Sequence, residues 1–194
     1  YWDGLCAVFF CCVAWDEANL GGLYRRGGDF GVRIIDKEKL MNIIFVCHGN
    51  ICRSVMAEFV FKDMLQSANL DKKFGEICVF SRATSREAIG EDIYPATKQI
   101  LVRENIEFCA HSARQISRDE FEKADLILCM DGLNLRNLTR HFGSFSDEKV
   151  KLLLDFSDKF SGEIADPYYT RDFETTFLQI KSGCVGLIKS LNLI

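Results

Sequence analysis

The chain has 194 residues, enough for one domain of ordinary size with a sizeable hydrophobic core. It carries 24 Lys and Arg against 28 Asp and Glu, a formal net charge of -4, and no dense basic stripe, which argues against nucleic acid as a main partner. Because no apolar stretch approaches the roughly 20 residues that span a bilayer, we expect no membrane partner either.

Residues 1–40 differ in composition from the rest of the chain. They contain both tryptophans, Trp2 and Trp15, six of the fourteen glycines and the apolar run LCAVFFCCVAW. A strand is expected directly after Met41. We therefore interpret residues 1–40 as a poorly ordered N-terminal extension or an upstream leader, and residues 41–194 as the folded domain.

From Met41 onward, short apolar runs alternate with helical patterns. Each run is compact and apolar enough to be buried on both faces of a sheet, and the last helical pattern repeats apolar residues at three- and four-residue steps. The sequence predicts strands at 42–46, 77–80, 126–130 and 150–156, and helices at 54–67, about 92–104, 131–141 and 172–191. This alternation predicts an α/β fold, a single domain with a four-stranded parallel sheet and helices on both faces.

Polar residues follow the predicted strands. In parallel α/β sheets, ligands bind beyond the carboxyl ends of the strands, so these residues are expected to share one rim. They are Cys47 to Ser54 after the first strand, Ser81 and Thr84 after the second, Asp131 and Asn134 after the third, and Asp155 and Asp166 after the fourth.

The segment CHGNICRS (47–54) connects the first strand to the first helix. The backbone N–H groups of such a loop and the positive end of the helix dipole favour a bound oxyanion. Arg53 can bind two phosphate oxygens with its planar fork, and Gly49 permits close approach of the backbone. A thiol in this environment loses its proton readily, so Cys47 is predicted to be a thiolate nucleophile.

CHGNICRS closely resembles the phosphate-binding loop of the low-molecular-weight protein tyrosine phosphatases. The resemblance continues in SRATS (81–85), AHSARQIS (110–117), DLILCMDGLNLRNL (125–138) and DPYY (166–169), and IYPATKQIL (93–101) is closer to bacterial members. It implies a flavodoxin-like fold, with 41–194 as the phosphatase domain. It also implies hydrolysis of phosphotyrosine in proteins, or of a small aryl phosphate, through a phosphocysteine intermediate, with inorganic phosphate as product.

The resemblance also implies roles for individual residues. Cys47 is the nucleophile, Arg53 binds the phosphate and stabilises the transition state, and Asp166 is the general acid. The rest of the phosphate-binding loop is His48, Gly49, Asn50, Ile51, Cys52 and Ser54. Ser81 and His111 support the loop, and Tyr168 and Tyr169 form an aromatic wall beside the acid.

Most of these residues have simpler interpretations when each is taken alone. Ser54 is a reasonable helix N-cap, Asn50 a turn former and His111 a partly buried structural histidine. Asp131 is expected to cap the helix that follows it rather than to touch substrate. Where some members have an aromatic residue lining the cleft, this chain has Glu87, so we expect a more open and more acidic cleft.

Three other functions share this style of loop. An arsenate reductase needs further cysteines that relay a disulfide, and Cys109 and Cys129 do not form such a pair. A protein-arginine phosphatase typically has threonine at the position of Ile51. A catalytically inactive phosphate-binding module would not need both Cys47 and Asp166.

The cysteines bear on compartment and regulation. Those in segments such as GEICVF and LILCMD lie singly among apolar residues, which is typical of reduced, buried thiols and favours a cytoplasmic location. The resemblance implies that Cys52 protects Cys47 from peroxide by forming a disulfide with it, whereas the simpler interpretation is an apolar filler. We expect a monomer that needs no metal or organic cofactor, since no His, Cys and carboxylate set has ligand spacing.

Overall fold

The computed structural model describes residues 41–68 and 77–191, so the predicted extension at 1–40 lies outside the described residues. Four parallel strands form one sheet in the order β2-β1-β3-β4. They are β1 (Met41–Cys47), β2 (Ile77–Ala83), β3 (Leu126–Cys129) and β4 (Val150–Leu152). The predicted four-stranded parallel sheet is confirmed.

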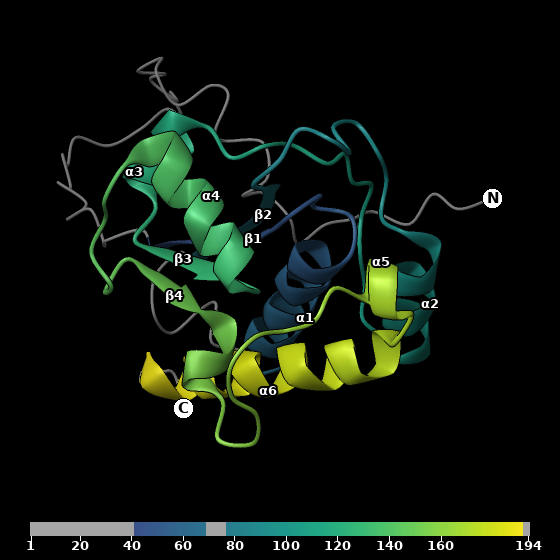
Figure 1. Ribbon diagram of the computed structural model, residues 1–194. Helices are drawn as coiled ribbons and strands as arrows, with labels where there is room; N and C mark the ends of the chain where they lie inside the picture. The colour runs from purple at the N-terminus through teal and green to yellow at the C-terminus, as the bar shows by residue number, and fades with distance from the viewer. Residues whose placement is uncertain (1–40, 69–76, 192–194) are drawn as a thin grey trace, which may run out of the picture. The chain divides into compact units, whose positions relative to one another are not determined.

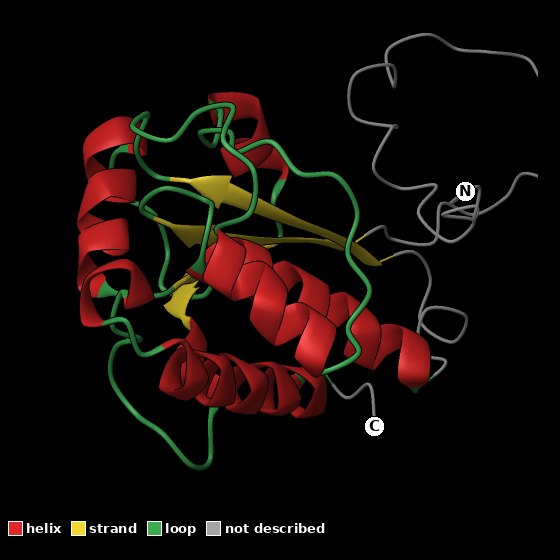
Figure 2. Cartoon of the chain, turned by 90° about the vertical axis from the view of Figure 1, so that its right-hand side faces the viewer, coloured by secondary structure: helices red, strands yellow, loops and turns green. Residues whose placement is uncertain are grey.

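Helices cover both faces of this sheet, as predicted. α1 and α6 pack against each other on one face, and α4 lies on the other (Figure 1). Figure 2 shows the strands between these two layers. The helical elements are α1 (Arg53–Ser67), α2 (Pro95–Arg103), α3 (Arg118–Lys123), α4 (Gly132–Phe142), the 3₁₀ turn η1 (Leu153–Phe156), α5 (Pro167–Thr170) and α6 (Phe173–Ser190).

The central strand β1 explains why the sheet is stable in this arrangement. Its residues Ile43 to Val46 are all 0% exposed, because β1 has a strand on each side and a helical layer on each face. A strand buried on both faces must be apolar throughout, which is what NIIFV supplies. β1 therefore delivers its last residue, Cys47, to the centre of the sheet's carboxyl edge.

The strand predicted over 150–156 is wrong beyond residue 152. The chain leaves the sheet at Leu153 and forms η1, whose Leu153 and Leu154 remain buried. A Cβ on Gly183 of α6 would lie 2.9 Å from the Leu153 carbonyl oxygen, and one on Gly186 would lie 1.7 Å from the Phe156 carbonyl oxygen. The two glycines let α6 pack directly on the turn, so burial against a helix replaces strand pairing.

Helix ends follow local sequence chemistry. The helix predicted over 92–104 begins at Pro95, because proline's fixed φ suits the first helical position. α3 was not predicted, although Ser117 and Glu120 form a reciprocal capping box at its start. α5 was also not predicted, and it has only four residues.

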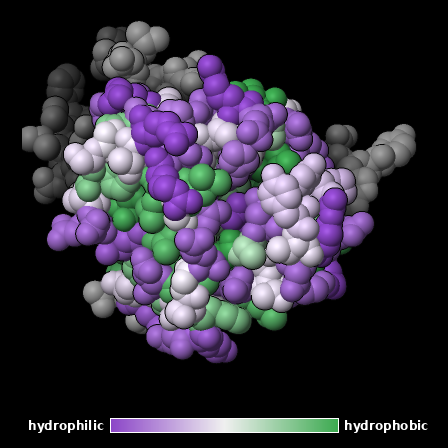
Figure 3. All heavy atoms as spheres, in the orientation of Figure 1, coloured by the Kyte–Doolittle hydropathy of each residue, from purple (hydrophilic) through white to green (hydrophobic). Residues whose placement is uncertain are grey.

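The surface is mixed in polarity. On the face seen in Figure 3, hydrophilic residues separate smaller hydrophobic patches. Within residues 41–68 and 77–191, none of the helices is both long and apolar enough to cross a membrane.

Candidate active site

The loop between β1 and α1 begins at the point in the sheet from which the chain connections run to opposite sides. β1 pairs with β2 on one side and β3 on the other, and this switch point is where open α/β sheets bind ligands. Backbone hydrogen bonds join the loop to the segment after β2, from Thr84 N to the Cys47 carbonyl at 2.8 Å and from Ser85 N to the His48 carbonyl at 3.0 Å. These bonds bring together the first two strand ends predicted to share the rim. Asp155, predicted at the same rim, instead lies in η1, where its Oδ2 accepts from Leu152 N at 3.1 Å.

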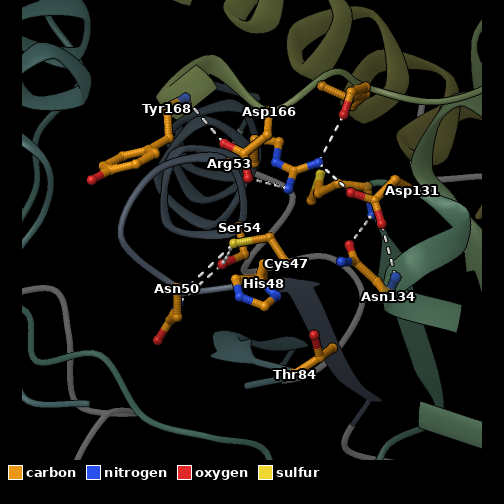
Figure 4. Close-up of polar contacts among 12 residues, drawn as sticks. Cys47, His48, Asn50, Arg53, Ser54, Thr84, Asp131, Asn134, Asp166 and Tyr168 are labelled. Atoms are coloured by element: carbon orange, nitrogen blue, oxygen red, sulfur yellow. Dashed lines mark hydrogen bonds and ion pairs between the residues drawn. The ribbon is translucent and has the colours of Figure 1, made fainter. Parts of the chain in front are cut away.

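The Cys47 thiol lies inside this loop and is only 3% exposed. Its Sγ is 3.0 Å from Ser54 Oγ and accepts a hydrogen bond from Asn50 N at 3.3 Å. Figure 4 shows Asn50, Ser54 and Cys47 converging at this point. Ser54 and Asn50 are thus both within hydrogen-bonding distance of the same sulfur atom.

Asn50 organises the loop. Its φ of 61° lies in the left-handed region, which asparagine tolerates better than most residues. Its side-chain Nδ2 donates to Ser54 Oγ at 3.0 Å and to Ser81 Oγ at 2.9 Å, and its carbonyl accepts from His111 Nε2 at 2.8 Å. The supporting residues Ser81 and His111 predicted from sequence therefore both contact Asn50.

The direction of these hydrogen bonds is determined by Glu58. Ser81 Oγ donates to Glu58 Oε2 at 2.5 Å, so the Ser81 oxygen is left to accept from Asn50. Ser54 Oγ also accepts from Asn50, which leaves its one hydrogen for Cys47. Ser54 thus donates to the Cys47 sulfur and does not cap α1. The N-cap residue of α1 is Cys52, and its side chain makes no capping hydrogen bond.

Arg53 is fully enclosed, with 2% exposure, and its guanidinium lies between two carboxylates. Nη1 donates to Asp131 Oδ2 at 2.6 Å and to the Ile164 carbonyl at 2.8 Å, and Nη2 donates to Asp166 Oδ2 at 2.6 Å (Figure 4). Burial lowers the pKa of Arg53, but the negative charges on Cys47, Asp166 and Asp131 outweigh it, so the pKa lies above its ordinary value.

One donor of Arg53 has no protein acceptor. Its Nε is buried and makes no hydrogen bond to the described residues. Because Arg53 lines the pocket described below, this N–H is available to an anionic ligand.

Asp131 has two roles, and only one was predicted. It caps α4, since its Oδ1 accepts from Asn134 N at 2.8 Å. Its second carboxylate oxygen holds Arg53, and this contact was missed because the two residues are 78 positions apart. The position of Asp131 on the common rim was the available signal.

Asp166 uses its two carboxylate oxygens for different purposes. Oδ2 binds Arg53, while Oδ1 accepts from Tyr168 N at 3.1 Å and caps the short helix α5. Pro167 follows at the first helical position and restricts the backbone there. The carboxylate is half-buried at the edge of the loop, within reach of a bound phosphate ester.

These groups surround a pocket of about 310 Å³. Tyr168 and Tyr169 line it while being 45% and 76% exposed, so both lie at its open side. Glu87 and Glu91 line it as well, in agreement with the predicted acidic cleft. The full set of lining residues is Cys47, His48, Gly49, Ile51, Cys52, Arg53, Glu87, Ala88, Glu91, Asp166, Tyr168 and Tyr169.

His48, next to the nucleophile, leans toward this acidic side. Its Nε2 is 2.9 Å from Glu87 Oε2. The contact ties the loop to the segment after β2.

Cys52 lies in the same loop as Cys47, and both are free thiols. Burial, and then the charge of Cys47, raise the pKa of Cys52 to about 12. Cys52 is therefore protonated at neutral pH and does not compete with Cys47 as a nucleophile.

The comparisons with known proteins agree with this geometry. The family profile described as "Low molecular weight phosphotyrosine protein phosphatase" matches residues 42–193. The chain belongs to this family. It is 37% identical over 153 residues to the low molecular weight protein-tyrosine-phosphatase YfkJ of Bacillus subtilis, a match that covers 78% of this chain and 96% of that protein.

Solved structures of family members show the same fold. The crystal structure of YfkJ superposes with a TM-score of 0.74 at 35% identity and covers 79% of this chain and 96% of its own. The structure of the YwlE arginine phosphatase superposes with a TM-score of 0.68 at 26% identity and covers 78% of this chain and 96% of its own. The family assignment and the fold predicted from the sequence are therefore confirmed.

Proposed function

We propose that this family member hydrolyses phosphotyrosine and other aryl phosphate monoesters through a phosphocysteine intermediate. The observation that carries the proposal is the enclosure of the Cys47 sulfur by donors, 3.0 Å from Ser54 Oγ and 3.3 Å from Asn50 N, in a pocket also lined by Arg53 and Asp166. A buried thiolate needs such donors to remain an anion.

Substrate binding requires a change of partners at Arg53. A phosphate dianion in the loop accepts from Nε, which has no protein acceptor, and competes with Asp166 for Nη2. Asp131 and the Ile164 carbonyl keep Nη1 in place during this exchange. Asp166 is then next to the phosphate ester, and a proton on its carboxyl removes the repulsion between the two anions.

In the first chemical step, the Cys47 thiolate attacks phosphorus and the bond from phosphorus to the phenolic oxygen breaks. Asp166 gives its proton to the departing oxygen, and phosphate remains on sulfur. In the second step, a water molecule attacks phosphorus and its proton goes to Asp166. Inorganic phosphate leaves, and the Cys47 thiolate is restored.

The aromatic wall favours an aryl group beside the phosphate, on a protein or a small molecule. Ile51 supports phosphotyrosine over phosphoarginine, and Cys129, fully buried with a pKa raised by its burial, gives no support to a disulfide relay of the arsenate reductase kind. No metal or organic cofactor enters the proposed reaction, and we propose that the protein works as a monomer in the cytoplasm.

The test is hydrolysis of p-nitrophenyl phosphate and a phosphotyrosine peptide by the purified protein in the presence of a chelator. We expect turnover without metal, and a fall of at least about 1,000-fold for Cys47→Ser with inorganic phosphate binding retained. Rapid acid quenching of the wild type followed by mass spectrometry should find phosphate on Cys47. Metal-dependent turnover, or near-normal rates in Cys47→Ser, would overturn the proposal.

A further inference from the structure

The wall residue Tyr168 is not held in place by burial. It is 45% exposed and belongs to α5, a helix of four residues that is too short to be stable by itself. Its backbone N–H donates to Asp166 Oδ1 at 3.1 Å, the hydrogen bond that caps α5. If Tyr168 is to face an aryl substrate in a fixed orientation, neighbouring side chains must therefore hold it there.

The Tyr168 ring contacts the ring of the adjacent Tyr169 edge-on at 5.3 Å, and two residues outside α5 contact it as well. The Tyr94 ring contacts the Tyr168 ring edge-on at 5.8 Å, and the Arg171 guanidinium lies 5.5 Å from the centre of the Tyr168 ring. Arg171 Nη1 also donates to Tyr94 Oη at 2.9 Å. The three side chains thus contact one another pairwise and form a closed set, which we call the Tyr94–Arg171 clamp on Tyr168.

Tyr94 anchors the clamp to the phosphate-binding loop. Its backbone N–H donates to the Ile51 carbonyl at 2.9 Å, and Ile51 lines the pocket. Its ring stacks on Phe173 at the start of α6, with ring centres 5.6 Å apart and planes 2° from parallel. The position of Tyr94 is therefore determined by the loop and by α6. Through its ring contact, Tyr94 in turn restricts the position of Tyr168.

Arg171 occupies a backbone conformation that a long side chain rarely adopts. Its φ is 62°, at the C-cap of α5, where glycine would be free of strain. The strain is opposed by the two contacts of the guanidinium. Arginine at this position therefore strains the backbone, and its side chain makes contacts with Tyr94 and Tyr168 that glycine could not make.

We infer that Arg171 and Tyr94 are positioning residues that set specificity for aryl phosphates by holding Tyr168 at the mouth of the pocket. This inference rests on the proposed function. Neither side chain reaches the reacting atoms, so their loss weakens the contact with the aryl group and leaves the binding of the phosphate itself unchanged.

The experiment compares two ligands in the same variants by calorimetry. Inorganic phosphate reports on the loop, and phenylphosphonate, which cannot be hydrolysed, reports on the loop and the wall together. Arg171→Gly removes the side chain and suits the positive φ, and Tyr94→Phe removes only the hydroxyl. We expect each to weaken phenylphosphonate about two- to fivefold and to leave phosphate affinity unchanged, because a cation on an exposed ring contributes modestly.

Three further variants separate the clamp from general effects of charge. The double variant should lose little more than either single variant, since both remove the same contact. Arg118→Gln is the matched control, because Arg118 also lies over an aromatic ring, 5.6 Å from the centre of Phe142, but on α3. Arg118→Gln should change the affinity for neither ligand, whereas Arg171→Gln should weaken the binding of phenylphosphonate and leave that of phosphate unchanged.

The outcomes are distinct. Equal weakening of both ligands in Arg171→Gly or Tyr94→Phe would mean that these residues act on the loop or the fold, and unchanged phenylphosphonate affinity would mean that the clamp does not hold the wall. Either result overturns the inference. A wild type that binds both ligands but turns over no aryl phosphate would overturn the proposed function alone.

Discussion

The phosphate-binding loop and the segment 166–171 line the same pocket but are held by different forces. In the loop, Cys47, Asn50, Arg53 and Ser54 are each no more than 3% exposed. Hydrogen bonds connect Cys47, Asn50 and Ser54, and Arg53 is hydrogen-bonded to Asp131 and Asp166. The segment 166–171 is a capped helix of four residues with two exposed tyrosines. Burial and hydrogen bonding organise the first region. The second is held by the Asp166–Arg53 ion pair and by contacts between partly exposed side chains.

The difference corresponds to what each region has to do in the proposed reaction. A site for a transition-state anion must be ordered before substrate arrives, because reorganising its dipoles during reaction would cost rate. A general acid and its wall must move enough to release Arg53 and to let an aryl group enter. Weakly held exposed segments open at low free-energy cost, which suits this second task.

The largest effect within this comparison is expected at Asp166. Asp166→Ala should lower kcat about 100- to 10,000-fold for substrates with basic leaving groups, since general acid catalysis is typically of this size. It should lower kcat far less for acidic leaving groups, which depart without a proton. A leaving-group series with Asp166→Asn as the matched variant measures this, and equal losses across the series would assign Asp166 to structure.

Asn50 tests the buried side of the comparison. Asn50→Gly keeps the positive φ but removes the side-chain donors to Ser54 and Ser81. We expect kcat to fall about 10- to 100-fold, because the hydroxyls of Ser54 and Ser81 lose their fixed orientation and buried polar groups lose partners. Asn50→Asp also tolerates the backbone but offers acceptors instead of donors, so it should be at least as impaired as glycine.

The Asn50 variants need a measurement of thermal stability as well as of kcat. A variant whose kcat falls in proportion to its folded fraction, measured by thermal unfolding, would contradict an orienting role.

Cys52 adds a redox test of the loop. Burial, and then the charge of Cys47, raise the pKa of Cys52 to about 12, and oxidation of Cys47 to an uncharged sulfenic acid removes the second of these effects. Cys52→Ser should change kcat by less than about twofold, since Cys52 takes no part in the chemical steps. After peroxide, dithiol should restore the wild type but not Cys52→Ser, and mass spectrometry should find a Cys47–Cys52 disulfide only in the former. Equal recovery of both proteins would leave Cys52 as packing.

The smallest effect is expected from removing residues 1–40. The loop and the segment 166–171 make all the contacts described above within residues 41–191, so a protein that starts at Met41 should keep its thermal midpoint and its kcat/KM. A lower thermal midpoint or a lower kcat/KM would mean that the folded domain begins before Met41 and that residues 1–40 contribute to it.

Much of the site was predictable because it is local in sequence. CHGNICRS lies between a strand that must be apolar and a helix, so its place at the carboxyl edge of the sheet follows from the pattern of the chain. Asp166 was predictable from its place after the last strand together with the family resemblance. The helices at 54–67 and 172–191 were predictable because their apolar faces repeat over many turns.

Tertiary structure alone determined the contacts that give these residues their environment. Arg53 meets Asp131 and Asp166 across 78 and 113 residues, and Arg171 meets Tyr94 across 77. No periodic pattern reports such pairs, because each depends on two distant loops ending at the same edge of the sheet. The end of β4 at residue 152 is of the same kind, since the apolar run VKLLLDF suits a strand and a buried turn equally well. The chain left the sheet there because Gly183 and Gly186 of α6 allow the backbone of η1 to pack against the helix.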